Sequence, residues 1–295
     1  MYFCYRMLKF LGSLVLFLCS FMSVAQISEQ HPEHHSSPTY EFIPNQGQWH
    51  PRVLYKTTIP YGHLFLESDG LTYDIMQPAD YNAVQEQKHA HSADSTFVLH
   101  KHAFRLQFLN MEYAPRHKAS RIQNHYYNYY YSSDEEKWAT GVHPAGKVAY
   151  ADVYPGVDFE ITGEQEIKYQ WVIDNPTSQR VSQIKLQVEG ANNVRLQDGM
   201  LVIETNAGEV AEDAPFVYQI IDNELIELNT IYTLADNVVG YEIRAEIDAN
   251  YPLIIDPKLI FSTYSGSVGD NFGYTATYDS RGNLYAGGIV DGRGD

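Results

Sequence analysis

Histidine is the residue type in this sequence that points most directly to metal chemistry, and all 12 copies lie before residue 144. If His100 and His102 lie on a strand, their rings project from the same face, because side chains two residues apart do so. The sequence has no His-Glu-x-x-His pattern and no third ligand at a diagnostic distance, so we predict solvated histidines and neither a metal nor another cofactor. The groups close enough in sequence to share a transition-metal ion are His31 with His34 and His35, His89 with His91, and His100 with His102.

Two carboxylates form a second candidate for chemistry. Asp152 and Asp158 flank a Tyr-Pro-Gly turn, and glycoside hydrolysis uses such a carboxylate pair. The turn chemistry of Pro155-Gly156 explains the same segment without catalysis. The sequence also has no nucleophile elbow, phosphate-binding loop or dinucleotide fingerprint. We therefore favour the structural role and expect no enzyme, with a carbohydrate-active hydrolase as the less favoured alternative.

The third candidate is the aromatic run Tyr126–Tyr131. If exposed, Tyr127, Tyr129 and Tyr131 would form a ledge that binds surface glycans or proteins, because tyrosine gives rigid contact area. The alternative is an edge or core strand with both faces covered, since tyrosine buries readily when its hydroxyl has a partner. We favour the covered strand, and these three tyrosines are the only binding residues that the sequence suggests.

Composition restricts the classes of protein and partner. The chain has 295 residues, of which 44% are hydrophobic and 19% charged, values typical of a folded globular protein. Its net charge of -17 repels nucleic acid and anionic lipid, so we expect no nucleic-acid partner. The two cysteines, Cys4 and Cys19, lie near the N-terminus, and the rest of the chain can therefore form no disulfide or thiolate site.

The first 25 residues have the pattern of a signal peptide. A basic region, Met1–Lys9, precedes an apolar run, Leu11–Met22, and the small residues Ser23-Val24-Ala25. The apolar run is shorter than the ~20 residues that span a bilayer, so an uncleaved anchor is the less favoured alternative. We predict cleavage between Ala25 and Gln26, no stable membrane insertion afterwards, and a secreted or cell-surface protein.

Beyond a flexible polar leader at residues 26–39, the patterns are those of short strands. A hairpin is predicted at Asp69-Gly70, a long polar loop at Pro78–Ser95, and further turns at Asp198-Gly199 and Asn206–Gly208. Apolar and polar residues alternate over 104–108, 184–188 and 241–247, and no amphipathic helix of ten or more residues is evident. These patterns predict an all-β fold of the sandwich or meander type.

Four motifs occur in the order in which they occur in one family of bacterial domains. With them the chain resembles a domain of unknown function that precedes SBBP-type β-propeller repeats in large secreted proteins, many of them from Bacteroidota. The resemblance covers about residues 40–257. The motifs are Phe42–Trp49, Asp152–Asp158, Ala214–Gln219 and Pro252–Pro257.

The segments Phe261–Gly266 and Asp279–Gly288 are similar to one SBBP repeat. The resemblance implies a β-rich domain at 40–257 followed by a single incomplete propeller-type repeat at 258–295. A division of the first domain near residue 145 is left open. The resemblance further implies that the chain is a fragment of a non-catalytic structural or adhesion protein, and that this protein leaves the cell by type IX secretion.

Overall fold

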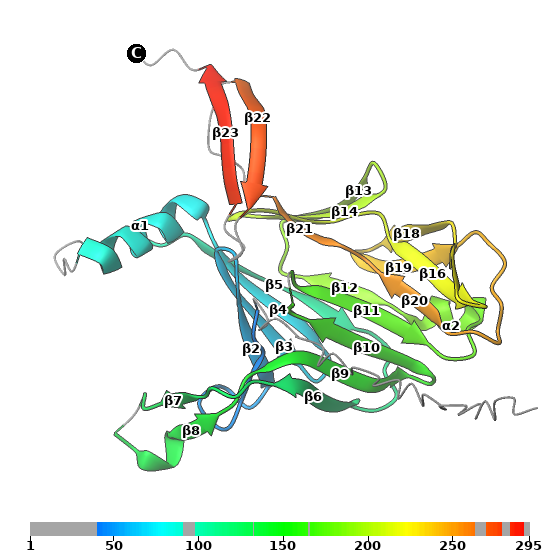
Figure 1. Cartoon of the computed structure of the whole chain (residues 1–295), viewed down its shortest axis with the longest axis horizontal. Helices are drawn as coiled ribbons and strands as arrows, with labels where there is room; N and C mark the ends of the chain where they lie inside the picture. The colour runs from blue at the N-terminus through cyan, green and yellow to red at the C-terminus, as the bar shows by residue number, and fades with distance from the viewer. Residues whose placement is uncertain are drawn as a thin grey trace, which may run out of the picture. The chain divides into compact units, whose positions relative to one another are not determined.

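The computed structural model describes residues 40–90, 98–131, 133–164, 166–262, 270–278 and 284–291, with backbone only for 85–90, 137 and everything from 259 onward. Antiparallel sheets dominate and helices are few (Figure 1), which confirms the predicted all-β class. Within these ranges no sheet closes on itself or forms a propeller blade. The predicted signal peptide and leader lie outside the described residues.

The largest sheet has eight antiparallel strands in the order β1-β2-β3-β4-β5-β12-β19-β18. Consecutive hairpins build its first half, and β12 joins that half to the last hairpin by pairing with both β5 and β19. The strands are Ile43–Pro44 (β1), Val53–Ile59 (β2), Gly62–Glu67 (β3), Gly70–Met76 (β4), Lys101–Phe108 (β5), Leu186–Glu189 (β12), Val238–Ile243 (β19) and Thr230–Ala235 (β18).

A second sheet has seven antiparallel strands in the order β17-β16-β20-β11-β10-β9-β6. Its strands alternate buried and partly exposed residues, as expected where one face lies on the core. The strands are Glu224–Glu227 (β17), Phe216–Ile221 (β16), Leu253–Asp256 (β20), Lys168–Ile173 (β11), Val157–Thr162 (β10), Ala145–Tyr154 (β9) and Arg116–Ile122 (β6).

The remaining strands form three smaller sheets of four, two and two strands. The four-stranded sheet comprises Asn193–Gln197 (β13), Met200–Thr205 (β14), Gly208–Glu212 (β15) and Leu259–Ser262 (β21), and the two hairpins are Tyr127–Tyr129 (β7) with Ala139–Val142 (β8) and Asp270–Tyr278 (β22) with Leu284–Asp291 (β23).

The core lies where side chains of the two large sheets meet. The Phe108 ring, on β5, lies with its centroid 5.2 Å from Phe159 on β10 and 5.3 Å from Trp171 on β11. All three side chains are almost fully buried and belong to one continuous hydrophobic cluster. Burial of such large aromatic groups is a main source of folding free energy, so the contact holds the two sheets together.

Turns predicted from sequence form where expected, with one shift. Asp198 and Gly199 have φ values of 52° and 83°, as a two-residue hairpin turn requires. At Asp69-Gly70 the hairpin forms, but Glu67 pairs with Gly70, so the turn residues are Ser68 and Asp69. Gly70 is instead needed because a Cβ there would lie 2.2 Å from the Leu106 carbonyl oxygen.

Two predicted strands are shorter than their alternation suggested. The first, predicted over 184–188, begins only at Leu186, because Ile184 caps the short helix Ser178–Gln183 (α2). The second, predicted over 241–247, ends at Ile243. The predicted domain limits stay predictions, and the division near residue 145 stays open.

The long loop predicted at Pro78–Ser95 is wrong, because Pro78–Ala90 forms a helix (α1). Proline suits the first position of a helix, and Asp80 lies in the first turn, where the helix dipole favours an acid. The later residues are mostly good helix formers without an apolar stripe. A search for apolar periodicity therefore missed a helix that depends on propensity and on the residues of its first turn.

A buried ion network supports the hairpin of β3 and β4. Arg105 Nε donates to Glu67 Oε2 at 2.9 Å, and Arg105 Nη2 donates to Asp69 Oδ1 at 2.6 Å. Glu67 also accepts a hydrogen bond from the Thr72 hydroxyl at 3.1 Å and lies 2.9 Å from Arg52 Nε. Because Arg105 and Glu67 are buried, removal of one partner leaves a poorly compensated charge.

We predict that Arg105→Met lowers the free energy of unfolding by about 3 kcal/mol, because Glu67 and Asp69 lose their buried partner. Urea denaturation measures the change. The control is Arg244→Met, which breaks a pair with Glu242 whose side chains are both 51% exposed, and which should cost less than about 1 kcal/mol. Equal losses in the two variants would contradict the assignment.

Candidate functional site

The tyrosine run lies on a two-stranded arm formed by β7 and β8, which Figure 1 shows extending away from the large sheets. Tyr127 pairs with Val142 and Tyr129 with Ala139, with an irregularity between the two pairs. The Gly141 N–H donates to Asn128 Oδ1 at 2.9 Å within that irregularity. A ribbon of two strands has no second layer, so it cannot cover its own faces.

Three tyrosines project from one face of the arm. The ring centroids of Tyr127 and Tyr129 are 6.4 Å apart, and those of Tyr129 and Tyr131 are 5.5 Å apart. Tyr127 is 39% exposed and Tyr131 is 72% exposed, while Tyr129 between them is partly buried. The covered strand favoured from sequence is therefore wrong, and the geometry is that of the exposed ledge. Binding by these residues stays a prediction.

The other face of the arm also carries aromatic side chains. Tyr126 packs against His143 at 5.7 Å and Tyr130 against Trp138 at 5.1 Å, both edge to face. Tyr126 and Tyr130 are each 57% exposed. They provide a matched comparison for the three tyrosines of the first face, because they are the same residue type in the same run, Tyr126–Tyr131.

The first face continues onto the body of the protein through Trp49. The Trp49 ring meets the Tyr129 ring edge to face at 5.5 Å, and Lys56 Nζ lies 5.5 Å from the Trp49 centroid. We call Tyr127, Tyr129, Tyr131 and Trp49 the aromatic row. Sequence patterns do not indicate this contact, because Trp49 and Tyr129 lie far apart along the chain.

One end of the aromatic row carries polar partners. The Tyr127 hydroxyl donates to Glu41 Oε2 at 2.9 Å, and His125 Nε2 lies 3.0 Å from Glu41 Oε1. Burial, together with neighbouring Tyr131 and Tyr127, raises the pKa of Tyr129 to about 12. Burial and the bond to Glu41 also raise the pKa of Tyr127. Both hydroxyls therefore stay neutral across the physiological range.

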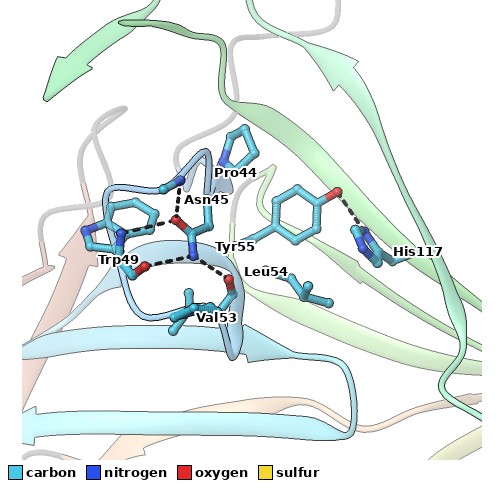
Figure 2. Close-up of a pocket in the computed structure, with 9 residues that line it drawn as sticks. Pro44, Asn45, Trp49, Val53, Leu54, Tyr55 and His117 are labelled. Atoms are coloured by element: carbon cyan, nitrogen blue, oxygen red, sulfur yellow. Dashed lines mark hydrogen bonds between the residues drawn. The ribbon is translucent and has the colours of Figure 1, made fainter. Parts of the chain in front are cut away.

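Trp49 also lines a pocket of about 570 Å³ (Figure 2). Its walls are largely apolar, and its polar groups include the pair formed by the Tyr55 hydroxyl and His117 Nδ1, 3.1 Å apart. The labelled lining residues are Pro44, Asn45, Trp49, Val53, Leu54, Tyr55 and His117.

The Asn45 side chain organises the loop that forms this pocket. Asn45 Nδ2 donates to the carbonyl oxygens of Trp49, His50 and Val53 at 3.3, 3.0 and 2.8 Å. Asn45 Oδ1 accepts the N–H groups of Gly47 and Trp49 at 3.0 and 3.1 Å. One amide thus contacts five backbone groups, with its two N–H groups shared among three carbonyl oxygens, and sets the position of Trp49 (Figure 2). This gives a physical role to the Asn of the first sequence motif.

Asp152 and Asp158 serve the turn that they flank. The Asp152 N–H donates to Asp158 Oδ1 at 2.8 Å, and the Gly156 N–H donates to Asp152 Oδ1 at 3.4 Å. Asp152 has φ of 54°, a conformation that Asp and Asn tolerate better than other side chains. These contacts agree with the structural role.

The described histidines are held by protein groups. His100 Nδ1 lies 2.9 Å from Asp80 Oδ2, and His102 Nε2 lies 2.7 Å from the Gly190 carbonyl oxygen, so the pair does not converge on a common point. Among the residues with described side chains, no group of three or more His, Cys, Asp or Glu could hold a metal ion. His31, His34, His35 and His91, and the side chain of His89, lie outside the described part of the chain.

Comparison with protein families gives one match. The model described as "Domain of unknown function (DUF7948)" matches residues 42–258. The chain belongs to this family. The match starts at Phe42 and so includes the Asn45 loop, and it confirms the domain-of-unknown-function part of the resemblance. No curated protein and no solved structure matches the chain.

Within this DUF7948 domain, the described helices include none that is both long enough and apolar enough to cross a membrane.

The core contains a buried acid, Glu212, that the sequence analysis missed. Glu212 Oε2 accepts hydrogen bonds from the hydroxyls of Tyr169 and Tyr232 at 2.8 and 3.2 Å. Burial raises the pKa of Glu212 to about 7, although the two hydroxyls oppose the shift.

We predict that Glu212→Gln makes the domain less sensitive to pH. The folded state holds the proton more tightly than the unfolded chain, so this group lowers the free energy of unfolding as the pH rises from 4.5 to about 7. Across that interval, the free energy of unfolding of the variant should rise by on the order of 3 kcal/mol relative to that of wild type. Urea denaturation from pH 4 to pH 8 measures it, with exposed Glu209→Gln on the same strand as control. A constant difference between Glu212→Gln and wild type would refute it.

We predict that Asn45→Asp destabilises the domain by about 2 kcal/mol, because a carboxylate cannot donate to the three carbonyl oxygens. Thermal unfolding and the tryptophan fluorescence of the folded state should both change, since Trp49 lies in the affected loop. Gln46→Glu, the same chemical change at the exposed neighbouring residue, is the control and should leave both unchanged. If the two variants behave alike, Asn45 does not organise the loop.

Proposed function

We propose that this chain is a non-catalytic adhesion-type protein that binds its partner through the aromatic row. The observation that carries the proposal is the exposure of Tyr127 and Tyr131 on one face of the arm, with the partly buried Tyr129 between them and Trp49 beside it. Aromatic rings give large contact area at small entropic cost, and exposed groups of them mark interaction surfaces. The partner would be a surface glycan or a protein, as the sequence suggested.

The arrangement of the arm supports binding better than a structural role for these rings. Tyr131 is 72% exposed and so contributes little to the core. Tyr126 and Tyr130 each contact a separate ring on the other face, His143 and Trp138, whereas the row places Tyr127, Tyr129 and Tyr131 next to one another on one face. A carbohydrate-active hydrolase using Asp152 and Asp158 is less favoured, because both carboxylates accept hydrogen bonds from backbone N–H groups of their own turn.

The wider architecture belongs to the same proposal. We infer export through the signal peptide at residues 1–25 and a secreted or cell-surface location, with type IX secretion as the route that the resemblance implies. The two large sheets would form a sandwich-type module that precedes SBBP propeller repeats. Support for this comes from the shared core cluster of the sheets and from the repeat-like sequence after residue 258.

We predict that the triple variant Tyr127→Ala/Tyr129→Ala/Tyr131→Ala loses attachment to surfaces that wild type binds, while each change costs no more than about 1 kcal/mol of stability. Attachment is measured with labelled full-length protein on a glycan array and on an array of extracellular-matrix proteins. The double variant Tyr126→Ala/Tyr130→Ala, on the other face, is the control and should attach as wild type does. Attachment that survives the triple variant, or loss only through unfolding, would refute the proposal.

A further inference from the structure

The rings of the aromatic row do not share a plane. The interplanar angle is 43° between Tyr127 and Tyr129, 51° between Tyr129 and Tyr131, and 67° between Trp49 and Tyr129. A flat crystalline polysaccharide stacks best on coplanar rings, because its sugar faces lie in one plane. Rings that turn from one to the next match a single polymer chain that twists along its length.

The polar group at the end of the row selects for ligands with hydrogen-bond donors. The Glu41 carboxylate only accepts hydrogen bonds, and its side chain keeps 18% of its surface exposed beside Tyr127. Sugar hydroxyls can donate to it. A proline-rich peptide, the usual partner of aromatic-lined protein grooves, offers mainly carbonyl oxygens, which a carboxylate repels. The chemistry of this end therefore favours a glycan over such a peptide.

Charge narrows the class of glycan. The net charge of -17 disfavours anionic polysaccharides at long range. Near the row the acids Glu135 and Glu136 lie at the tip of the arm, and both are exposed. A neutral chain avoids this repulsion and can still use its hydroxyl groups at Glu41.

The pocket adjoins the middle of the row and not its end. Trp49, which lines the pocket, contacts Tyr129, and Tyr129 stands between Tyr127 and Tyr131. The volume of about 570 Å³ falls in the range of about 300–1,000 Å³ found for small-molecule sites. A polymer that lies along the tyrosines would therefore place a side branch, and not its terminus, at the pocket. The His117 side chain lies at this pocket (Figure 2).

Building on the proposed function of the aromatic row, we propose that its ligand is a single soluble chain of a branched neutral polysaccharide. The backbone of the polysaccharide lies along Tyr127, Tyr129 and Tyr131. One branch sugar occupies the pocket beside Trp49, where His117 offers a hydrogen bond.

Titration calorimetry with three pairs of soluble probes tests this: galactomannan with linear mannan, xyloglucan with cellohexaose, and arabinoxylan with linear xylan. We expect full-length protein to bind the branched member of at least one pair about tenfold more tightly than the linear member. Tyr131→Ala should weaken both members of that pair about tenfold, as loss of one stacked ring does. His117→Ala should remove only the preference for the branched member. Tyr113→Ala, a 76% exposed tyrosine outside the row, should change neither.

Sedimentation with crystalline cellulose and chitin, and titration with polygalacturonate and a proline-rich peptide, complete the test. Row-dependent binding to any of these four, or equal binding of branched and linear chains, would overturn the ligand class while leaving the aromatic row as a binding surface. If the soluble probes do not bind but attachment to matrix proteins in the array depends on the row, the polysaccharide ligand is also overturned and the row remains a binding surface. Absence of row-dependent attachment in both experiments would overturn the proposed function as well.

Discussion

The contact of Phe108 with Phe159 and Trp171 is the interaction on which the other features depend. It joins the eight-stranded and seven-stranded sheets, which contribute most of the buried residues. The arm and the pocket have little core of their own, since the arm is a ribbon of two strands and the pocket loop is held mainly by hydrogen bonds of the Asn45 and Gln48 side chains. Their positions are fixed because both attach to the sheets that this contact unites.

The pocket loop shows how the two sheets fix the position of a feature outside the core. The loop lies between β1 and β2, and these strands pair with each other at the edge of the eight-stranded sheet. Tyr55 on β2 reaches across to His117 on β6 of the seven-stranded sheet. The pocket therefore takes walls from both large sheets, and its shape depends on their relative position. A substitution in the core can change the pocket without touching it.

The sequence predicted features that local chemistry determines and missed those that depend on distant neighbours. Asp198-Gly199 was predictable because two adjacent left-handed residues admit few residue types. The pairs Asp222-Asn223 and Asp236-Asn237 use the same left-handed conformations, so the same signal was present there. Exposure of the tyrosine run was not predictable, since it depends on whether another layer covers β7. The contact of Trp49 with Tyr129 was not predictable either, because the two residues lie far apart along the chain.

The high tyrosine content illustrates the same limit. Tyr169 and Tyr232 are buried, and their hydroxyls donate to the Glu212 carboxyl, which compensates for their removal from water. Tyr127 also donates to a carboxylate, that of Glu41, yet it stays exposed, because none of the sheets in the described part of the chain lies over the arm. A hydroxyl partner therefore permits burial but does not cause it. What decides is whether apolar surface from a second layer is available, and only the fold supplies that. In this domain tyrosine serves the core in one place and the surface in another, and the difference between the two lies entirely in the neighbours.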